Sequence, residues 1–438
     1  MALLAPEAVP EAAPLLGDDA PLHNNDSTSQ RTSQDVDPRF ALKIAAAMFS
    51  FATLGLFNSS IGVLLPLISA HYNLSDLHVS LIFVFGPVGY IVAAQMSSLV
   101  HYHFGQFGIA LLGPVLQIIA AALLSLHPPF GLVLVGFAVQ GLGSGLLDGS
   151  WCAWAGSMEK SSTMSGFLHG SYSAGAATAP ILITAMTTNG HAWYTWCYVL
   201  VALSVVDAVA LSAAFWNETA SAYRQMHQSE RTDNKAHAQA TFKFPATWWC
   251  AAYCLADVGV ETAISGWVVS FMLRSRSATP YLAGLSSSGY WAGMAVGRLV
   301  LGPLTDNIGV RKATVMYFAI ALIVQMLFAV LPYVSTSVML MVALGFLMGP
   351  LFPSGVIVLT QLLPKELHVA AVSFVASLGQ VGGALLPFGI GAVVEGLGIG
   401  VFRYAILLQS GIAMMLWVGF ARLRPAASIF EQSWTHEN

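Results

Sequence analysis

The chain has 438 residues, of which 56% are hydrophobic and only 9% are charged, and its formal net charge is −4. An ordinary soluble protein carries about 25% charged residues. This composition, with a mean hydropathy of +0.70, therefore indicates a polytopic membrane protein. The near-neutral charge and the lack of a basic stripe argue against a nucleic-acid-binding protein. Four cysteines are too few for a disulfide framework, and we expect no metal or other cofactor.

The apolar stretches of the chain predict an all-α membrane protein. A spanning helix needs about 20 mostly apolar residues, and twelve stretches meet this requirement. They cover residues 43–69, 78–100, 107–126, 130–156, 164–187, 194–216, 246–273, 281–304, 313–331, 335–362, 368–395 and 401–421.

One long polar connection divides these helices six and six. We predict a disordered tail over 1–40, a six-helix bundle over 41–216, a central loop over 217–245, a second bundle over 246–424 and a tail over 425–438. The halves also repeat weakly, because GFLHGSYSAGAATAP (166–180) aligns with SFVASLGQVGGALLP (373–387) at an offset of 207. Such internal repeats are typical of transporters.

The basic residues predict the orientation of the chain in the membrane. With an even number of helices, both termini lie on one side, and only Arg274, Arg276 and Arg403 lie on the other. The positive-inside rule therefore places both termini in the cytosol. The basic residues on the side of the termini are Arg31, Arg39, Lys43, Lys160, Arg224, Arg231, Lys235, Lys243, Arg311, Lys312, Lys365, Arg422 and Arg424.

Two carboxylates stand inside the otherwise uncharged run 246–273. Asp257 and Glu261 lie one helical turn apart in the stretch LADVGVETAISGW (255–267). An ionised carboxylate at the bilayer centre costs about 2.5–3.5 kcal/mol on insertion scales. Acids at such positions typically mark proton relays or substrate pathways, so we interpret the pair as a proton-loading site.

The sequence GPLTDNIGVRK (302–312) resembles the cytoplasmic loop motif of the major facilitator superfamily. The resemblance implies two pseudo-symmetric six-helix bundles and a conformational latch formed by Gly302, Leu304, Asp306, Gly309, Arg311 and Lys312. The corresponding place in the first half, SLVHYHFGQFG (98–108), keeps Gly105 but has Tyr102 in place of the acid.

A finer resemblance is to the fucose–proton symporter-like branch of that family, and to its fungal members in particular. It rests on GLGSGLLDGSWCAWAG (141–156), GFLHGSYSAGA (166–176) and VGVETAISGW (258–267). The resemblance implies proton-coupling roles for Asp148 and Glu261, with Asp257 in support. Asp257 departs from the branch, which often has a tyrosine at this position. A simple hydrogen bond to a neighbouring helix is the alternative for each acid, and for Asp207 and His169 it is the favoured one.

In the fold that the resemblance implies, the first, fourth, seventh and tenth helices line a central cavity. We find no Lys or Arg in the middle of these four helices or of the fifth and eleventh, and this favours a neutral or weakly cationic solute. Packing between helices and aromatic belts at the membrane surface are the alternative roles for the cavity candidates. The candidates for substrate binding are Asn58, Gln140, Trp151, Trp154, Tyr253, Trp267, Trp291, Gln361 and Gln380.

Two short motifs bear on localisation. EAAPLL (11–16) fits an acidic dileucine sorting signal at Glu11, Leu15 and Leu16, and Asn73 begins a glycosylation sequon. The first motif resembles signals that route membrane proteins to vacuoles or lysosomes, and we expect either a plasma membrane or a vacuolar membrane.

The sequence thus predicts a monomeric secondary transporter that contacts membrane lipid, protons and a small neutral solute, such as a sugar. A proton-antiport exporter of a fungal secondary metabolite or toxin is the alternative. A nutrient sensor that has lost transport is a third hypothesis. We find no nucleotide motif, serine elbow or metal cluster, so we do not expect an enzyme.

Overall fold

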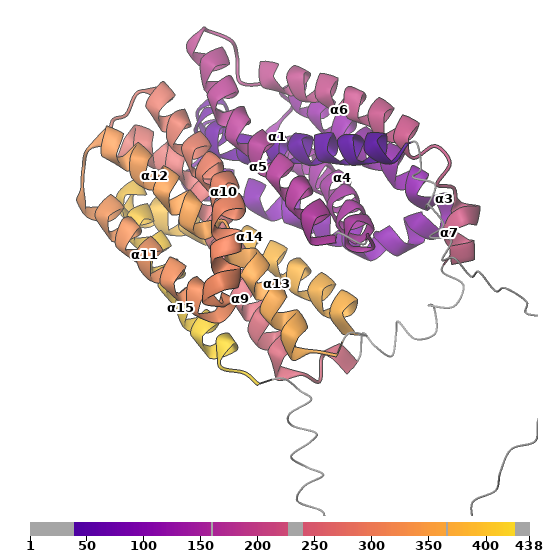
Figure 1. The fold of residues 1–438 in the computed structure, drawn as a ribbon. Helices are drawn as coiled ribbons and strands as arrows, with labels where there is room; N and C mark the ends of the chain where they lie inside the picture. The colour runs from indigo at the N-terminus through magenta and orange to yellow at the C-terminus, as the bar shows by residue number, and fades with distance from the viewer. Residues whose placement is uncertain (1–38, 159–160, 227–239, 365–366, 425–438) are drawn as a thin grey trace, which may run out of the picture. The chain divides into compact units, whose positions relative to one another are not determined.

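The computed structural model describes residues 39–158, 161–226, 240–364 and 367–424. The chain divides into two units, Met1–Phe40 and Ala41–Asn438, and the second contains the helices described below. The sorting motif of Glu11, Leu15 and Leu16 lies outside the described residues. Within the described residues the second unit is helical and has no β-strand, so the prediction of an all-α protein is confirmed (Figure 1).

The first half of the chain follows the predicted order of helices. The predicted helices 78–100 and 107–126 are both present within one element, α3 (Ile82–Ser125), and are separated by a kink at Gly105, whose φ of 71° and ψ of −169° are not helical. The elements are α1 (Phe40–Tyr72), α2 (Asp76–Val79), α3 (Ile82–Ser125), α4 (Phe130–Gly156), α5 (Ser161–Thr188), α6 (Thr195–Ala214) and α7 (Ala220–Met226).

In the second half, one predicted helix is broken. The predicted span 335–362 ends its first part at Met348 and resumes at Leu351, because Pro350 has no N–H to continue the helix. The elements are α9 (Pro245–Arg274), α10 (Pro280–Ile308), α11 (Val310–Val330), α12 (Val334–Met348), α13 (Leu351–Leu362), α14 (His368–Leu397), η2 (Ile399–Val401) and α15 (Phe402–Ala421).

Nine stretches of the described residues are long and apolar enough to cross a membrane. One of them, Asp76–Ser125, has 50 residues and contains the bend at Gly105, so it provides two crossings. The helices α5 and α10 have 28 and 29 residues but are rich in Ser, Thr and Gly, which lowers their hydropathy. These numbers are consistent with twelve crossings.

The repeat between the halves corresponds to equivalent helix contacts. Gly175 of α5 meets α1 so closely that a Cβ would lie 1.9 Å from the carbonyl oxygen of Ala52. Its repeat partner Gly382 of α14 meets α9 in the same way, with 1.8 Å to the carbonyl oxygen of Leu255. Small residues allow two membrane helices to approach this closely. Each glycine therefore sets the packing of one pair of helices.

Replacing either glycine by valine is expected to destabilise the protein, because the backbone of the neighbouring helix would have to move. Overpacking of this kind typically costs about 1–3 kcal/mol. The melting temperature of the detergent-solubilised protein should fall for Gly175→Val and for Gly382→Val. Gly170→Ala is the control, since a Cβ at Gly170 would meet nothing within 4 Å. Equal melting temperatures for all three variants would contradict this account of the packing.

The two sides of the helical unit can be distinguished from helix direction. Successive long helices alternate in direction, so the start of α1, the loop at Glu218, the turn at Gly309 and the end of α15 lie on one side. We call this the terminal side, and the other, which carries Asp76, Arg274 and Glu395, the opposite side. On the terminal side, Lys43 forms an ion pair of 2.7 Å with Glu218.

Candidate functional site

A central pocket lies where α1, α3, α9 and α10 meet. Its cavity volume is about 20 Å³, which is little more than one water molecule needs, so the site is tightly closed in this conformation. The pocket brings together three of the predicted site residues, Asn58, Glu261 and Trp291, and adds apolar walls. Its lining residues are Asn58, Ile61, Phe83, Glu261, Thr262, Ser265, Gly266 and Trp291.

Hydrogen bonds hold the polar side chains of this pocket in place. The indole Nε1 of Trp291 donates to Ser265 Oγ at 3.0 Å, which fixes the ring of α10 against α9. Asn58 donates through Nδ2 to the hydroxyl of Tyr172 on α5. The Tyr172 ring in turn lies edge-on to Trp291, with 5.8 Å between the centroids. An amide, a phenol and an indole thus converge from three helices, and this combination can bind a hydroxylated solute.

The two carboxylates of α9 differ in their access to this pocket. Glu261 is half-buried and lies in its wall, whereas Asp257 is only 3% exposed and lies one turn nearer the terminal side. The guanidinium of Arg298 on α10 interacts electrostatically with both. Arg298 is not among the residues predicted from the sequence, because it lies towards the terminal-side end of α10.

Asp148 belongs to a second polar cluster, nearer the terminal side. Its Oδ2 accepts a hydrogen bond from the hydroxyl of Tyr90 on α3. Its Oδ1 lies 3.5 Å from Cys152 Sγ, one turn further along α4. The ring Nε2 of His169 on α5 lies 3.9 Å from the same sulfur. Tyr172 interacts electrostatically with both Asp148 and Glu261, so it stands between the two clusters.

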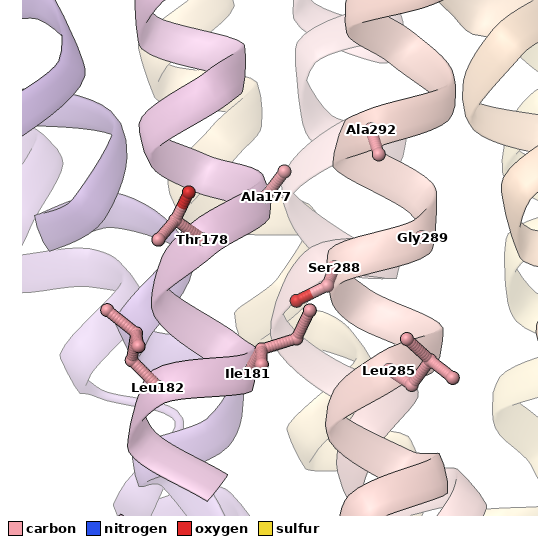
Figure 2. A pocket seen from close by; sticks show the side chains of 8 residues that line it. All are labelled: Ala177, Thr178, Ile181, Leu182, Leu285, Ser288, Gly289 and Ala292. Atoms are coloured by element: carbon pink, nitrogen blue, oxygen red, sulfur yellow. The ribbon is translucent and has the colours of Figure 1, made fainter. Parts of the chain in front are cut away.

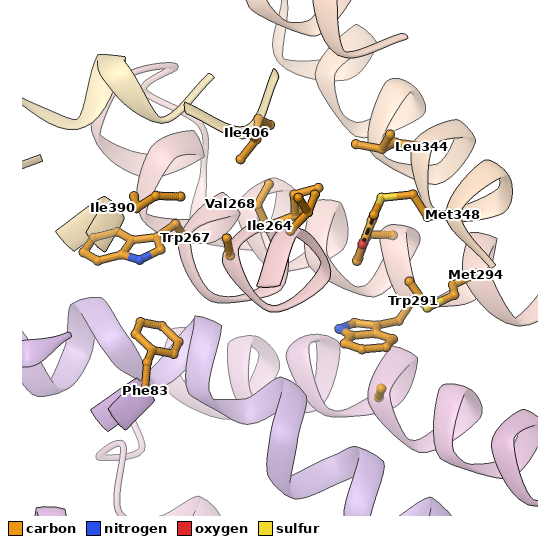
Figure 3. Close-up of a cluster of buried hydrophobic side chains, with 14 of the residues drawn as sticks. Phe83, Ile264, Trp267, Val268, Trp291, Met294, Leu344, Met348, Ile390 and Ile406 are labelled. Atoms are coloured by element: carbon orange, nitrogen blue, oxygen red, sulfur yellow. Dashed lines mark hydrogen bonds between the residues drawn. The ribbon is translucent and has the colours of Figure 1, made fainter. Parts of the chain in front are cut away.

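Large side chains from both halves close the opposite side of the pocket. Figure 3 shows Phe83 of α3 facing Trp267 of α9, and the two ring centroids are 6.2 Å apart. Trp267 is fully buried and donates to the carbonyl of Pro387 at 2.9 Å. At Gly62, a Cβ would lie 2.1 Å from the carbonyl oxygen of Ser265, so α1 and α9 touch here without side chains between them.

Polar contacts continue this closure towards the opposite side. Arg274 at the end of α9 forms two bonds of 2.6 and 3.0 Å with the carboxylate of Asp76 on α2. Glu395 of α14 accepts from the backbone N–H of Leu77 at 3.2 Å. Both contacts join the first half of the chain to the second. The two halves therefore meet on the opposite side of the central pocket.

Several predicted substrate-binding residues lie in other surroundings. Gln140 donates to Ser144 of its own helix at 2.8 Å. Trp151 and Trp154 pack on Phe215, and Tyr253 donates to the carbonyl of Leu351 at 2.9 Å. Neither Gln361, which is exposed on α13, nor the half-buried Gln380 of α14 lines the central pocket. The structure does not bring these six residues to that pocket.

The residues of the predicted latch form the turn between α10 and α11. Gly309 ends α10 with φ 91°, a backbone conformation that favours glycine. Arg311 donates to the carbonyls of Ala421 and Leu423, at 2.8 and 3.0 Å, and thereby caps the end of α15. Asp306 and Lys312 are exposed, and a Cβ at Gly302 would meet nothing within 4 Å. Their role as a latch stays a prediction.

A second pocket lies between α5 and α10, and it is almost wholly apolar (Figure 2). Thr178 contributes a hydroxyl, but this donates to the carbonyl of Ala174 in its own helix. Ile181 and Leu182 are exposed at its edge. No carboxylate lines this pocket, so it lacks the chemistry of the central one. The lining residues are Ala177, Thr178, Ile181, Leu182, Leu285, Ser288, Gly289 and Ala292.

Among the described residues, no group of three His, Cys, Asp or Glu side chains is arranged to hold a metal ion. Cys152, Cys197, Cys250 and Cys254 are all free thiols. Cys250 donates to the carbonyl of Gly355 at 3.5 Å within the apolar core, as expected for a small filler of space.

Comparison with known proteins gives concordant results. The model of the Major Facilitator Superfamily matches residues 47–273 and 249–434. "Bypass of stop codon protein 6" of Saccharomyces cerevisiae is 28% identical over 393 residues, which are 83% of this chain and 79% of the relative. "Glucose/mannose transporter GlcP" of Bacillus subtilis is 20% identical over 388 residues, 84% of this chain and 92% of the relative.

The fold also matches a solved structure. The crystal structure of a D-xylose–proton symporter superposes with a TM-score of 0.68 at 12% identity, over 88% of this chain and 98% of the other. At this identity the likeness shows the fold alone. It confirms the predicted architecture, while the finer resemblance to the fucose–proton branch stays a prediction.

Proposed function

The chain belongs to the major facilitator superfamily, and on that premise we propose that it couples proton movement to the transport of a small neutral sugar. It is an integral membrane transporter rather than an enzyme. The observation that carries the proposal is the position of Glu261, which lies in the wall of the central pocket with Asn58 and Trp291. The names of the glucose/mannose relative and of the xylose–proton symporter support a sugar as the solute.

We infer that the terminal side faces the cytosol, from the excess of Lys and Arg there. The contacts at Asp76 and Arg274 then close the pocket towards the outside. Asp148, Cys152 and His169 lie between the pocket and the cytosolic side. This arrangement corresponds to one of the two end states of alternating access, in which the site is closed on one face of the membrane. The six-helix division at 217–245 provides the two rocking bodies.

In this proposal the acids have distinct tasks. Glu261 binds the transported proton, because it alone among the three contacts the space that the solute enters. Asp148, hydrogen-bonded to Tyr90, receives the proton on its way to the cytosol. Asp257 supports Glu261, because two neighbouring negative charges repel each other and so favour the uptake of a proton. Carboxylates in such positions are costly in a membrane and typically relay protons.

Uptake by proteoliposomes tests this function. Purified protein is reconstituted and given radiolabelled glucose, mannose or xylose, with and without an imposed pH gradient. We expect one of these sugars to accumulate inside against its gradient, and we expect the accumulation to collapse when an ionophore dissipates the pH gradient. Accumulation that is unchanged by the ionophore, or equilibration without accumulation, would contradict proton coupling.

Export of a flat organic metabolite is the second candidate, since Ile61, Phe83 and Trp291 give the pocket three apolar side chains. The same proteoliposomes distinguish it. An exporter working by antiport would accumulate a planar aromatic compound only when the vesicle lumen is acidic, and it would ignore the three sugars.

Asn58→Ala is expected to weaken sugar binding, because the amide offers the pocket a donor and an acceptor. A hydrogen bond contributes about 0.5–1.5 kcal/mol, so the half-saturation constant for uptake should rise by roughly two- to tenfold. Thr178→Ala is the control, since Thr178 lines the apolar pocket of Figure 2 and bonds only within its helix. An unchanged constant in Asn58→Ala would favour the apolar metabolite instead.

A further inference from the structure

Arg298 occupies a junction of three elements from both halves of the chain. Its Nη1 donates to Ser173 Oγ at 2.6 Å and to the carbonyl of His169 at 3.4 Å, both on α5. Its Nε donates to the carbonyl of Gly349 at 3.4 Å, where α12 ends. All three acceptors are neutral groups. Arginine stays protonated in proteins, so this cation is held between the halves with no bonded counter-charge from the described part of the chain.

The counter-charge comes through space from α9. Asp257 and Glu261 both interact electrostatically with Arg298. A cation withdrawn from water is costly unless an opposite charge compensates it. Three further titratable groups interact with the guanidinium, and they carry no negative charge at neutral pH. They are His169 and Tyr172 on α5 and Tyr290 on α10.

The break between α12 and α13 strengthens this junction. The last carbonyls of a helix lack partners within the helix and attract cations. Gly349 also fits closely, because a Cβ there would lie 2.7 Å from the carbonyl oxygen of Met294 and 2.8 Å from the N of Arg298. The end of α12 is thus packed directly onto the turn of α10 that carries Arg298.

We propose that Arg298 is a positioning residue that links the charge of Glu261 and Asp257 to the contact between α10 and α5. This rests on the proposed function, since it concerns how proton loading is converted into movement of the halves. When the carboxylates are ionised, they draw the guanidinium towards α9 and weaken its bonds to α5. When a proton neutralises Glu261, the pull of α9 on the guanidinium weakens, and Ser173 with the carbonyls of His169 and Gly349 become its main partners. The contact between the halves is then stronger.

The primary test compares Arg298→Gln, Arg298→Lys and the double variant Arg298→Gln with Glu261→Gln. Proteoliposomes are assayed with the sugar among glucose, mannose and xylose that the wild type accumulates. Two quantities are measured, namely exchange at equal pH over a range of pH values, and accumulation driven by a pH gradient. Arg403→Gln is the control, because Arg403 likewise donates to a backbone carbonyl, that of Ala329, away from the pocket.

We expect Arg298→Gln to lose accumulation and to slow exchange, with a changed pH profile, because the carboxylates lose their counter-charge. Arg298→Lys should keep part of the accumulation. The double variant should regain part of the exchange, since Asp257 is then the one carboxylate of the pair that lacks its counter-charge, while accumulation stays absent. A merely structural role would instead lower the melting temperature and slow both processes equally in every variant. That result, or normal accumulation in Arg298→Gln, would overturn the proposal.

Two serine variants provide a milder test, which remains informative if the arginine variants misfold. Ser173 accepts from Arg298, whereas Ser171 on the same helix donates only to the carbonyl of Phe167. Ser173→Ala should lower the accumulation ratio and leave exchange close to wild type, and Ser171→Ala should change neither. Equal accumulation in both serine variants would overturn the proposal. If the wild type itself accumulates none of the sugars, the proposed function fails instead, so the two failures are distinguishable.

Discussion

Glu261→Gln should abolish the accumulation of sugar that a pH gradient drives, while exchange of sugar across the membrane persists. Glutamine keeps the size and polarity of the side chain but cannot carry a proton between the two faces. At one proton per sugar, a gradient of one pH unit supports about tenfold accumulation. The variant should therefore equilibrate sugar at a ratio near one. Proteoliposomes with and without an imposed gradient measure both quantities.

Asp207→Asn is the matched control for this variant. Asp207 is also a fully buried acid in a membrane helix, but it accepts a hydrogen bond from Ser50 of α1, away from the central pocket. The Asp207→Asn variant should therefore accumulate sugar as the wild type does. If Glu261→Gln accumulates sugar and Asp207→Asn does not, the proton is carried outside the central pocket.

Asp148→Asn is expected to have the second-largest effect, a strong decrease in the rate of proton-driven uptake. Asparagine can still accept the hydrogen bond from Tyr90, but it cannot take up a proton. A positioned proton-transfer group typically contributes about 10²–10⁴-fold to a rate, so a decrease of about a hundredfold or more is expected. Initial rates of uptake at a fixed pH gradient measure it. Exchange at equal pH should change much less, because Asp148 does not line the pocket.

Tyr90→Phe separates the two contributions of this cluster. The variant keeps the carboxylate of Asp148 but removes its hydrogen-bond donor. The rate of driven uptake should fall less than in Asp148→Asn. Equal rates in the wild type and in Asp148→Asn would show that the proton from Glu261 reaches the cytosol by another route.

The fold was largely predictable because the bilayer imposes helices of known length. The bend at Gly105 and the order of the helices follow from apolar runs and their interruptions. The break at Gly349 and Pro350 was missed, since a span counted by hydropathy continues across a proline. The repeat identified Gly175 and Gly382 as partners, but only the structure shows that each contacts a backbone carbonyl.

The candidate site was predictable only in part. Glu261 and Asp148 stand out because a lone acid in an apolar span is rare and costly. Tyr172 and Arg298 do not stand out, since their roles depend on which helix each faces. A helix that is apolar on every side gives no periodic signal of its rotation. The aromatic candidates were predicted from residue type alone, which does not show whether a side chain faces the pocket or the core. Tyr253, for example, lies in the core of the second half.

The central claim is that sugar and protons cross together, and proton flux measures this most directly. Proteoliposomes containing a trapped pH indicator are given sugar on the outside without any imposed gradient. The account predicts that the lumen acidifies when the transported sugar is added, and that Glu261→Gln transports by exchange without any acidification. Entry of sugar into wild-type vesicles with no change in internal pH would contradict the account.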